Sequence, residues 1–361
     1  MVARGARQKM TLVSIIIPCR NEERFIEQCL ASVLSFELPS GVEIEVLVVD
    51  GMSTDRTPAI VNVMAAGDRR VRVLSNPGVL QSAGLNCGLR EADGKWIMRL
   101  DAHCLYPRDY LKLCLQTAER TGADNVGGIV VTAPGADSYQ ARVVQALTTH
   151  PFGVGNAGFR LGAGEGPTDT VPYGFFDRQI FDRIGCFNEL LVRAQDYEFN
   201  RRIIASGGSV WRNPEIRVQY FNQATLRSFL RKQTDSEAPY NVYMWYVAPY
   251  AFTWRHAITG LFTGGVVGGA ALAVGHRRFR KLYGGALMLY GALALAASVQ
   301  QAARYRELKH VVCLPFGFAA FHLAHGRGIL RGALRLATGT APVQGRPNAG
   351  SPTTRARGRG D

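Results

Sequence analysis

The first hundred residues alternate between short apolar runs and amphipathic stretches. The runs are rich in β-branched residues and are typical of buried parallel strands. They cover residues 12–17, 44–49, 71–74 and 95–100. Apolar side chains recur at helical spacing from Phe25 to Leu34, and Ser53 and Thr54 are expected to cap a helix with Pro58 in its first turn. This alternation predicts a doubly wound α/β sheet with right-handed crossovers.

The middle of the chain, from about residue 125 to 235, mixes short strands with helices. Glycines mark the ends of two predicted helices, Asp177–Ile184 before Gly185 and Gln195–Ala205 before Gly207.

From residue 238 the pattern changes to a cluster of tyrosines and tryptophans followed by uncharged apolar stretches. Such a cluster is typical of a membrane interface. Ala257–Gly275 and Leu282–Val299 are each close to the ~20 residues that cross a bilayer, whereas Val311–Ala324 is shorter and contains Pro315. The alternative is a buried helical hairpin in a soluble protein. The aromatic cluster, and glycines suited to close helix contact, favour the membrane.

These changes of pattern predict four parts: a tail at 1–10, an α/β domain at 11–237, a membrane-associated helical region at 238–336 and a disordered basic tail at 337–361. The net charge is +14, and no nucleic-acid-binding motif accompanies it. We therefore expect an anionic membrane surface or a phosphate-bearing substrate, and no nucleic acid. The seven scattered cysteines form no C-x-x-C pair, which favours a reducing compartment, and the N-terminal apolar stretch is too short for a signal peptide. We therefore expect the α/β domain to lie in the cytoplasm.

Carboxylates stand at the ends of two predicted parallel strands. Asp50 follows IEVLVV and Asp101 follows KWIMRL, while residues 18–22 (PCRNE) end a third strand. A single such aspartate is often a helix cap, but ligands of open α/β sheets bind at the carboxyl ends of strands. The three strand ends together predict a ligand site.

The glycine-rich phosphate loops of dinucleotide-binding and P-loop proteins are absent from the sequence. A nucleotide is therefore expected to be held through carboxylates and a metal. In Asp101-Ala102-His103, a carboxylate and an imidazole two residues apart could reach one divalent ion on a diphosphate. The alternative is that His103 only donates a hydrogen bond to a phosphate.

Four segments, VSIIIPCRNEE, VLVVDGMSTDRT, MRLDAHCLYP and LVRAQDYEFNRRI, occur in this order. Together they resemble glycosyltransferase family 2, and most closely its succinoglycan-type exopolysaccharide β-glucosyltransferases, over about residues 12 to 235. The resemblance implies a GT-A fold, a nucleoside-diphosphate sugar donor (usually a UDP-sugar), Mn²⁺ or Mg²⁺, and inversion at the anomeric carbon.

The resemblance also implies roles for residues. It places the catalytic base at Asp196 and the metal at Asp101 and His103. Its expected nucleotide-sugar contacts are Pro18, Asn21, Glu22, Asp50 and Asp101. Its expected acceptor side comprises Gly174, Gln195, Arg231 and Gln233. The alternative for Asp196 is a surface helix with local ion pairs to the following charged residues, and for Arg231 a plain basic helix face beside the membrane.

Two departures from the family pattern change the expectation. His103 replaces the second carboxylate of D-x-D, which favours Mn²⁺ over Mg²⁺. The Q-x-x-R-W pattern of processive relatives is incomplete after Gln233, which favours a single addition.

The sequence thus predicts transfer of a hexose onto a polyprenyl-linked glycan in exopolysaccharide synthesis. The alternatives are a polyprenyl-phosphate glycosyltransferase, a catalytically inactive membrane scaffold and a soluble nucleotidyltransferase. The basic loop 276–281 opposes the positive-inside rule if 257–275 crosses the bilayer, so we also expect one apolar segment to be re-entrant or interfacial.

Overall fold

The computed structural model describes residues 10–344 and divides into two compact units. The α/β unit comprises 10–130 and 164–219, and the helical unit comprises 131–163 and 220–344. The divisions differ from the predicted boundary at residue 237, because residues 131–163 pack with the C-terminal helices. Of the predicted tails, 1–9 and 345–361 lie outside the described residues. Residues 338–344 turn back on the last helix, where the Thr340 N–H donates to the Arg335 carbonyl.

The sheet has eight strands in the order β3-β2-β1-β4-β7-β5-β8-β6. Its strands are β1 (Thr11–Cys19), β2 (Val42–Asp50), β3 (Val71–Ser75), β4 (Trp96–Arg99), β5 (Asn125–Ala133), β6 (Gly166–Pro167), β7 (Phe175–Asp177) and β8 (Val210–Phe221). The first four pair in parallel, which confirms the predicted α/β core, whereas β7 is antiparallel to both β4 and β5. The sheet is therefore mixed. The strands β6 and β7 have only two and three residues, too few for the apolar runs that marked the parallel strands.

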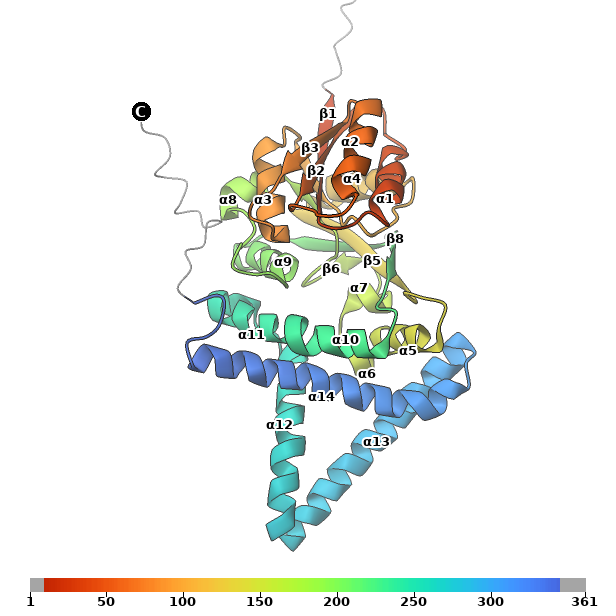
Figure 1. Cartoon of the computed structure of the whole chain (residues 1–361), viewed down its shortest axis with the longest axis vertical. Coiled ribbons are helices and arrows are strands. Elements are labelled where there is room, and N and C mark those ends of the chain that lie inside the picture. The colour runs from red at the N-terminus through yellow and green to blue at the C-terminus, as the bar shows by residue number, and fades with distance from the viewer. Residues whose placement is uncertain (1–9, 345–361) are drawn as a thin grey trace, which may run out of the picture. The chain divides into compact units, whose positions relative to one another are not determined.

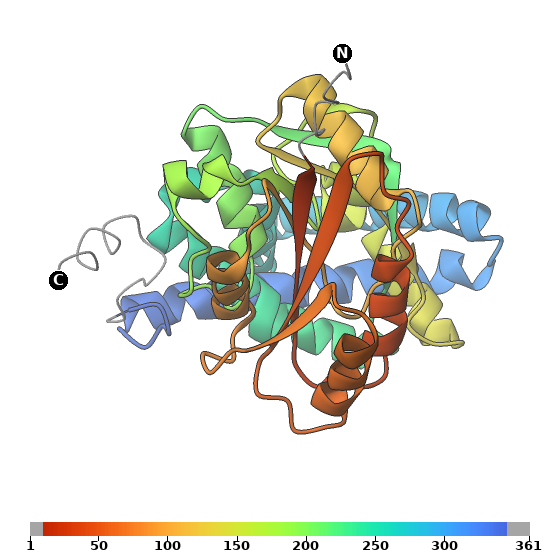
Figure 2. The ribbon, with the colours of Figure 1, turned by 90° about the horizontal axis from the view of Figure 1, so that it is seen from above.

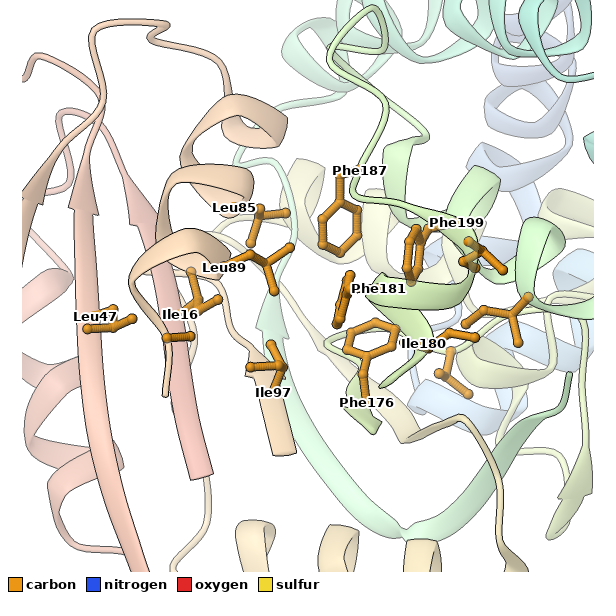
Figure 3. Packing of buried hydrophobic residues seen from close by; sticks show 14 of the residues in the cluster. Ile16, Leu47, Leu85, Leu89, Ile97, Phe176, Ile180, Phe181, Phe187 and Phe199 are labelled. Carbon is orange, nitrogen blue, oxygen red and sulfur yellow. The ribbon is translucent and has the colours of Figure 1, made fainter. Parts of the chain in front are cut away.

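Helices cover both faces of the parallel strands in the α/β unit. They are α1 (Ile26–Leu34), α2 (Thr57–Gly67), α3 (Gln81–Glu91), α4 (Tyr110–Thr121), α8 (Gln179–Ile184) and α9 (Gln195–Ala205). Figures 1 and 2 show α1, α2 and α4 on one side of the strands and α3, α8 and α9 on the other. The second set encloses an apolar cluster centred on Phe176, Phe181, Phe187 and Phe199 (Figure 3). This packing fixes the start of α9 against the sheet.

The predicted cap of α2 is wrong. Its first helical residue is Thr57, and Arg56 precedes it without a side-chain cap. The Ser53 hydroxyl accepts instead from the Asn21 backbone, and the Thr54 backbone donates to the Asn21 side chain. Contacts between two loops thus replaced the local cap.

The helical unit is built on three long helices. Its short helices are α5 (Tyr139–Thr148), α6 (Pro151–Val154), α7 (Gly158–Leu161), α10 (Leu226–Lys232), η1 (Gln233–Glu237), α11 (Ala238–Val247) and η2 (Pro249–Ala251). Its long helices are α12 (Trp254–Gly275), α13 (Arg277–Tyr305) and α14 (Lys309–Ala337). His276 joins α12 to α13, and Figure 1 shows the two helices diverging from their junction towards α14. The third apolar segment is longer than predicted, because α14 continues through Pro315.

Within the described residues, α12 and α13 are the two helices long and apolar enough to cross a membrane. Only 22% and 17% of their most apolar stretches are buried. A hairpin in a soluble core buries such side chains, whereas Leu261 and Val267 of α12 are 65% and 66% exposed. The exposure suggests membrane association.

Candidate active site

The carboxyl ends of β1, β2 and β3 lie side by side, with Cys19 opposite Asp50 and Asp50 opposite Ser75. The loops after β1 and β2 are joined by hydrogen bonds. Asn21 binds Ser53 and Thr54, and the Glu22 N–H donates to the Thr57 hydroxyl at 2.8 Å. The two loops therefore form one connected rim at this edge of the sheet, as expected from the alternation of strands and helices in the sequence.

Asp50 offers an unsatisfied acceptor at this rim. Its Oδ2 accepts from the Ser53 N–H at 3.1 Å, but its Oδ1 is buried and has no partner among the described residues. An unpaired buried acceptor of this kind costs about 1–3 kcal/mol, and a ligand N–H or O–H would remove that cost.

Asp101 lies just beyond β4 and is held by two side chains. Its Oδ1 accepts from Gln81 Nε2 at 2.9 Å and from the Arg99 guanidinium at 2.8 Å. These two contacts hold the Asp101 carboxylate in a fixed orientation just beyond β4.

Arg99 is the buried cation of the site. Burial opposes its charge, but the carboxylates of Asp101 and Asp196 outweigh that effect and hold the pKa of Arg99 above its ordinary value. Arg99 was not among the residues predicted from the sequence. The signal was present, since a charged residue within an otherwise apolar strand requires a buried counter-charge.

A chain of amides joins Asp101 to the start of α9. Gln81 donates to Asp101, and its Oε1 accepts from Gln195 Nε2 at 2.6 Å. Asp196 follows directly and is half-buried in the first turn of α9, where its Oδ1 accepts the Tyr197 N–H. Asp101, Gln195 and Asp196 are thus gathered into one cluster. Gln81 was also missed, because nothing in its local sequence distinguishes it.

Backbone strain concentrates in the loops of this cluster. Of the six non-glycine residues with positive φ in the described chain, five lie there: Asn21, Met52, Val79, Tyr173 and Ala194. Each left-handed residue costs of order 1–3 kcal/mol, and such residues persist mainly at functional sites. Ala194, with φ of 63°, directly precedes Gln195.

His103 contacts Glu22, with Nδ1 and Oε1 3.0 Å apart. If this nitrogen carries the proton, the tautomer leaves Nε2 as the metal-binding nitrogen. Burial raises the pKa of Cys19 and Cys104 to about 12, so these neighbouring thiols are neutral near pH 7 and poor ligands. The described residues contain no group of three or more potential metal ligands. Asp101 and His103 fit a divalent ion only where diphosphate oxygens complete its coordination.

The remaining predicted residues have internal roles in the structure. Pro18 is buried in β1 next to Gly84. Gly174 accepts from the Arg99 backbone, and a Cβ there would collide with the Phe176 ring, so packing alone requires glycine. Arg231 and Gln233 belong to the helical unit, at the end of α10 and the start of the π-helix η1, and their acceptor role stays a prediction.

The charged residues after Asp196 do not form a surface network. Glu198 is 1% exposed and binds Arg202 through both carboxylate oxygens, at 2.7 and 2.9 Å. Arg202 also donates to the Ile184 and Cys186 carbonyls. This ion pair attaches α9 to the preceding loop, whereas Asp196 lies outside it.

Comparison with solved structures identifies the fold. A mannosyltransferase, PcManGT from Pyrobaculum calidifontis, solved in complex with GDP-Man and Mn²⁺, matches with a TM-score of 0.53 at 21% identity, covering 90% of this chain and 87% of that one. At that identity the match shows the fold alone. The chain has the GT-A fold, followed by long apolar helices.

Sequence comparison then gives the family. Residues 14–185 match the family model described as Glycosyl transferase family 2, so this part of the chain is a domain of that family and the chain is a glycosyltransferase. The dolichyl N-acetyl-α-D-glucosaminyl phosphate 3-β-D-2,3-diacetamido-2,3-dideoxy-β-D-glucuronosyltransferase of Methanococcus voltae is 28% identical over 63% of this chain and 72% of that protein. The succinoglycan biosynthesis protein ExoA of Rhizobium meliloti is 29% identical over 59% of this chain and 64% of that protein.

Proposed function

We propose that the protein transfers a hexose from a UDP-sugar to a hydroxyl group of a lipid-linked glycan. The reaction would be a step in cell-surface polysaccharide synthesis. The observation that carries the proposal is the cluster of Asp101, Gln195 and Asp196 around the buried Arg99. The similarity to ExoA supports the polysaccharide context. The name of the Methanococcus relative specifies a sugar already attached to a dolichyl phosphate, which supports a lipid-linked acceptor.

Each side chain has a role in this proposal. The unpaired Oδ1 of Asp50 accepts an N–H group of the nucleobase, and Glu22 and Asp101 define the rest of the donor side. Asp196 removes the proton from the acceptor hydroxyl as the new bond forms with inversion. The Arg99 guanidinium attracts the carboxylates of both Asp101 and Asp196 and so compensates their charges.

Asp101 and His103 are the residues that would hold a divalent ion. When bound, Mn²⁺ or Mg²⁺ would neutralise charge on the departing diphosphate. The Glu22 carboxylate would orient His103, as a second carboxylate commonly does for a metal-binding histidine.

The metal preference provides a test of His103. We expect higher activity and tighter nucleotide binding with Mn²⁺ than with Mg²⁺, and we expect His103→Asp to shift the preference towards Mg²⁺, because a carboxylate suits the harder ion. The measurement is calorimetric titration of UDP in each metal, beside initial rates. Unchanged titrations of both metals in His103→Ala would show that His103 is not a ligand.

We further propose that α12 and α13 anchor the chain in a membrane, with the α/β unit on the cytoplasmic side. Their exposed apolar side chains support this proposal. Each helix is unbroken, and α12 spans 22 residues, or about 33 Å at the helical rise, which matches a bilayer core of about 30 Å. This length favours a full crossing over the re-entrant segment expected from the basic loop.

Charged side chains in α12 should release the protein from membranes. Leu261→Lys combined with Val267→Lys places two ammonium groups in the apolar stretch, each costing about 2.5–3.5 kcal/mol near the centre of a span. We expect the membrane-bound fraction after sedimentation to fall sharply. Val63→Lys is the matched control, because Val63 is 74% exposed on α2 in the α/β unit. If the double variant sediments like the native chain, attachment does not depend on α12.

Donor binding tests the proposed function directly. The purified chain would be titrated calorimetrically with UDP, GDP and their hexose derivatives in the presence of Mn²⁺. We expect at least one nucleotide sugar to bind, and Asp50→Asn to weaken that binding. Absence of binding by every nucleotide would contradict the proposal.

A further inference from the structure

The side chain of Gln195 has one hydrogen-bonding atom without a partner among the described residues. Gln195 is 4% exposed, and its Nε2 donates to Gln81 Oε1 at 2.6 Å. Its Oε1 is buried and accepts no hydrogen bond. Buried amide oxygens are normally satisfied, so this atom requires a donor that the chain itself does not supply.

The orientation of both amides follows from Asp101. An ionised carboxylate can only accept hydrogen bonds, so Gln81 must present its NH₂ group to Asp101. The Gln81 oxygen then faces Gln195, which must present its own NH₂ group in turn. The unpaired atom of Gln195 is therefore its oxygen, by necessity of the network.

The surroundings indicate which donor group this oxygen binds. Gln195 lies between Gln81, which holds Asp101, and Asp196, the proposed base. We infer that Gln195 Oε1 accepts a hydrogen bond from a hydroxyl of a bound sugar, an inference that rests on the proposed function. Gln81 is the positioning residue that holds the Gln195 amide in the required orientation.

The amide pair also explains why glutamine rather than glutamate occupies position 195. A glutamate there has no N–H for Gln81 Oε1 and would face that oxygen with a negative charge. Gln81 could not turn to meet it without losing its bond to Asp101. The glutamines at 81 and 195 therefore depend on each other.

The experiment separates the sugar from the nucleotide. The full chain would be titrated with UDP, UDP-glucose, UDP-N-acetylglucosamine, GDP and GDP-mannose in Mn²⁺, and the ratio of the Kd of each nucleotide to that of its sugar derivative measures the sugar's contribution. In Gln195→Met, which keeps the side-chain length, we expect this ratio to fall about tenfold for the donor, with the Kd of the nucleotide unchanged. Gln195→Leu, which also lacks an accepting oxygen, is the second variant if methionine prevents folding.

Further arms identify the source of the hydroxyl and test the positioning residue. An unchanged ratio with a raised KM for a lipid-extract acceptor would assign the hydroxyl to the acceptor sugar. Gln81→Met should reproduce the effect, and the double variant should lose little more than either single variant. Gln179→Met is the control, because Gln179 is an exposed first residue of α8.

The inference is overturned if Gln195→Met leaves both the ratio and the acceptor KM unchanged while the native chain binds a nucleotide sugar. If the native chain binds no nucleotide or nucleotide sugar, the proposed function fails, and the inference fails with it.

Discussion

Asp196→Asn should reduce turnover by about 10²–10⁴-fold while the nucleotide sugar still binds. The asparagine keeps the shape of the side chain, and its oxygen can still accept the Tyr197 N–H, but it cannot take a proton from the acceptor hydroxyl. Donor affinity should be retained because Asp50 and Asp101 are untouched. Initial rates of sugar transfer would be measured for the native chain and the variant, and the donor affinity of each would be measured by calorimetric titration.

The choice of control for Asp196 depends on the structure. Glu198 is unsuitable, because its buried pair with Arg202 would be broken and the fold destabilised. Asp109 directly precedes α4, is exposed and makes no side-chain cap, so Asp109→Asn should leave turnover unchanged. Near-normal turnover of Asp196→Asn would remove the base assignment and favour a lipid-phosphate acceptor, which needs no strong base.

Arg99→Met should destabilise the α/β unit by about 3–5 kcal/mol and abolish donor binding. The methionine fills much of the same volume but leaves Asp101 without its buried counter-charge and removes the positive charge near Asp196. Only 7% of the Arg99 side chain and 16% of the Asp101 side chain are exposed, so solvent screens the pair weakly. Urea unfolding and calorimetry provide the two measurements.

Two further variants make this prediction specific. Arg99→Lys keeps the charge but not the planar guanidinium, and should lose less stability than Arg99→Met. Arg90→Met removes an exposed arginine from α3 and should change stability by no more than about 0.5 kcal/mol. Equal stability of Arg99→Met and Arg90→Met would show that the buried cation is not required.

The parallel core could be predicted because its strands are continuous apolar runs, and their order places Asp50 and Asp101 at one edge of the sheet. The bounds of α9 were predicted to the residue, and the glycines that follow it are a local signal for its end. By contrast, Gln81 reaches Asp101 only through packing, and no local pattern around it indicates that contact.

The interpretations that changed depended on contacts distant in sequence. Glu198 and Arg202 have the spacing of an exposed helical pair, yet carbonyls of residues 184 and 186 complete a buried pair. Ser53 and Thr54 resemble helix caps but bind Asn21, more than 30 residues earlier. Pro315 suggested that the third apolar segment is short. In the structure, α14 continues through Pro315 and packs against α11, α12 and α13.

The most direct test of the account is transfer of labelled sugar by the purified full-length chain. Radiolabelled UDP- and GDP-sugars would be incubated with the protein, Mn²⁺ and a lipid extract, and the label in the organic phase would be counted. The account predicts that label from one nucleotide sugar enters the lipid phase with the native chain and is lost with Asp196→Asn. It would be contradicted if no donor labels the lipid phase, or if Asp196→Asn transfers label as fast as the native chain.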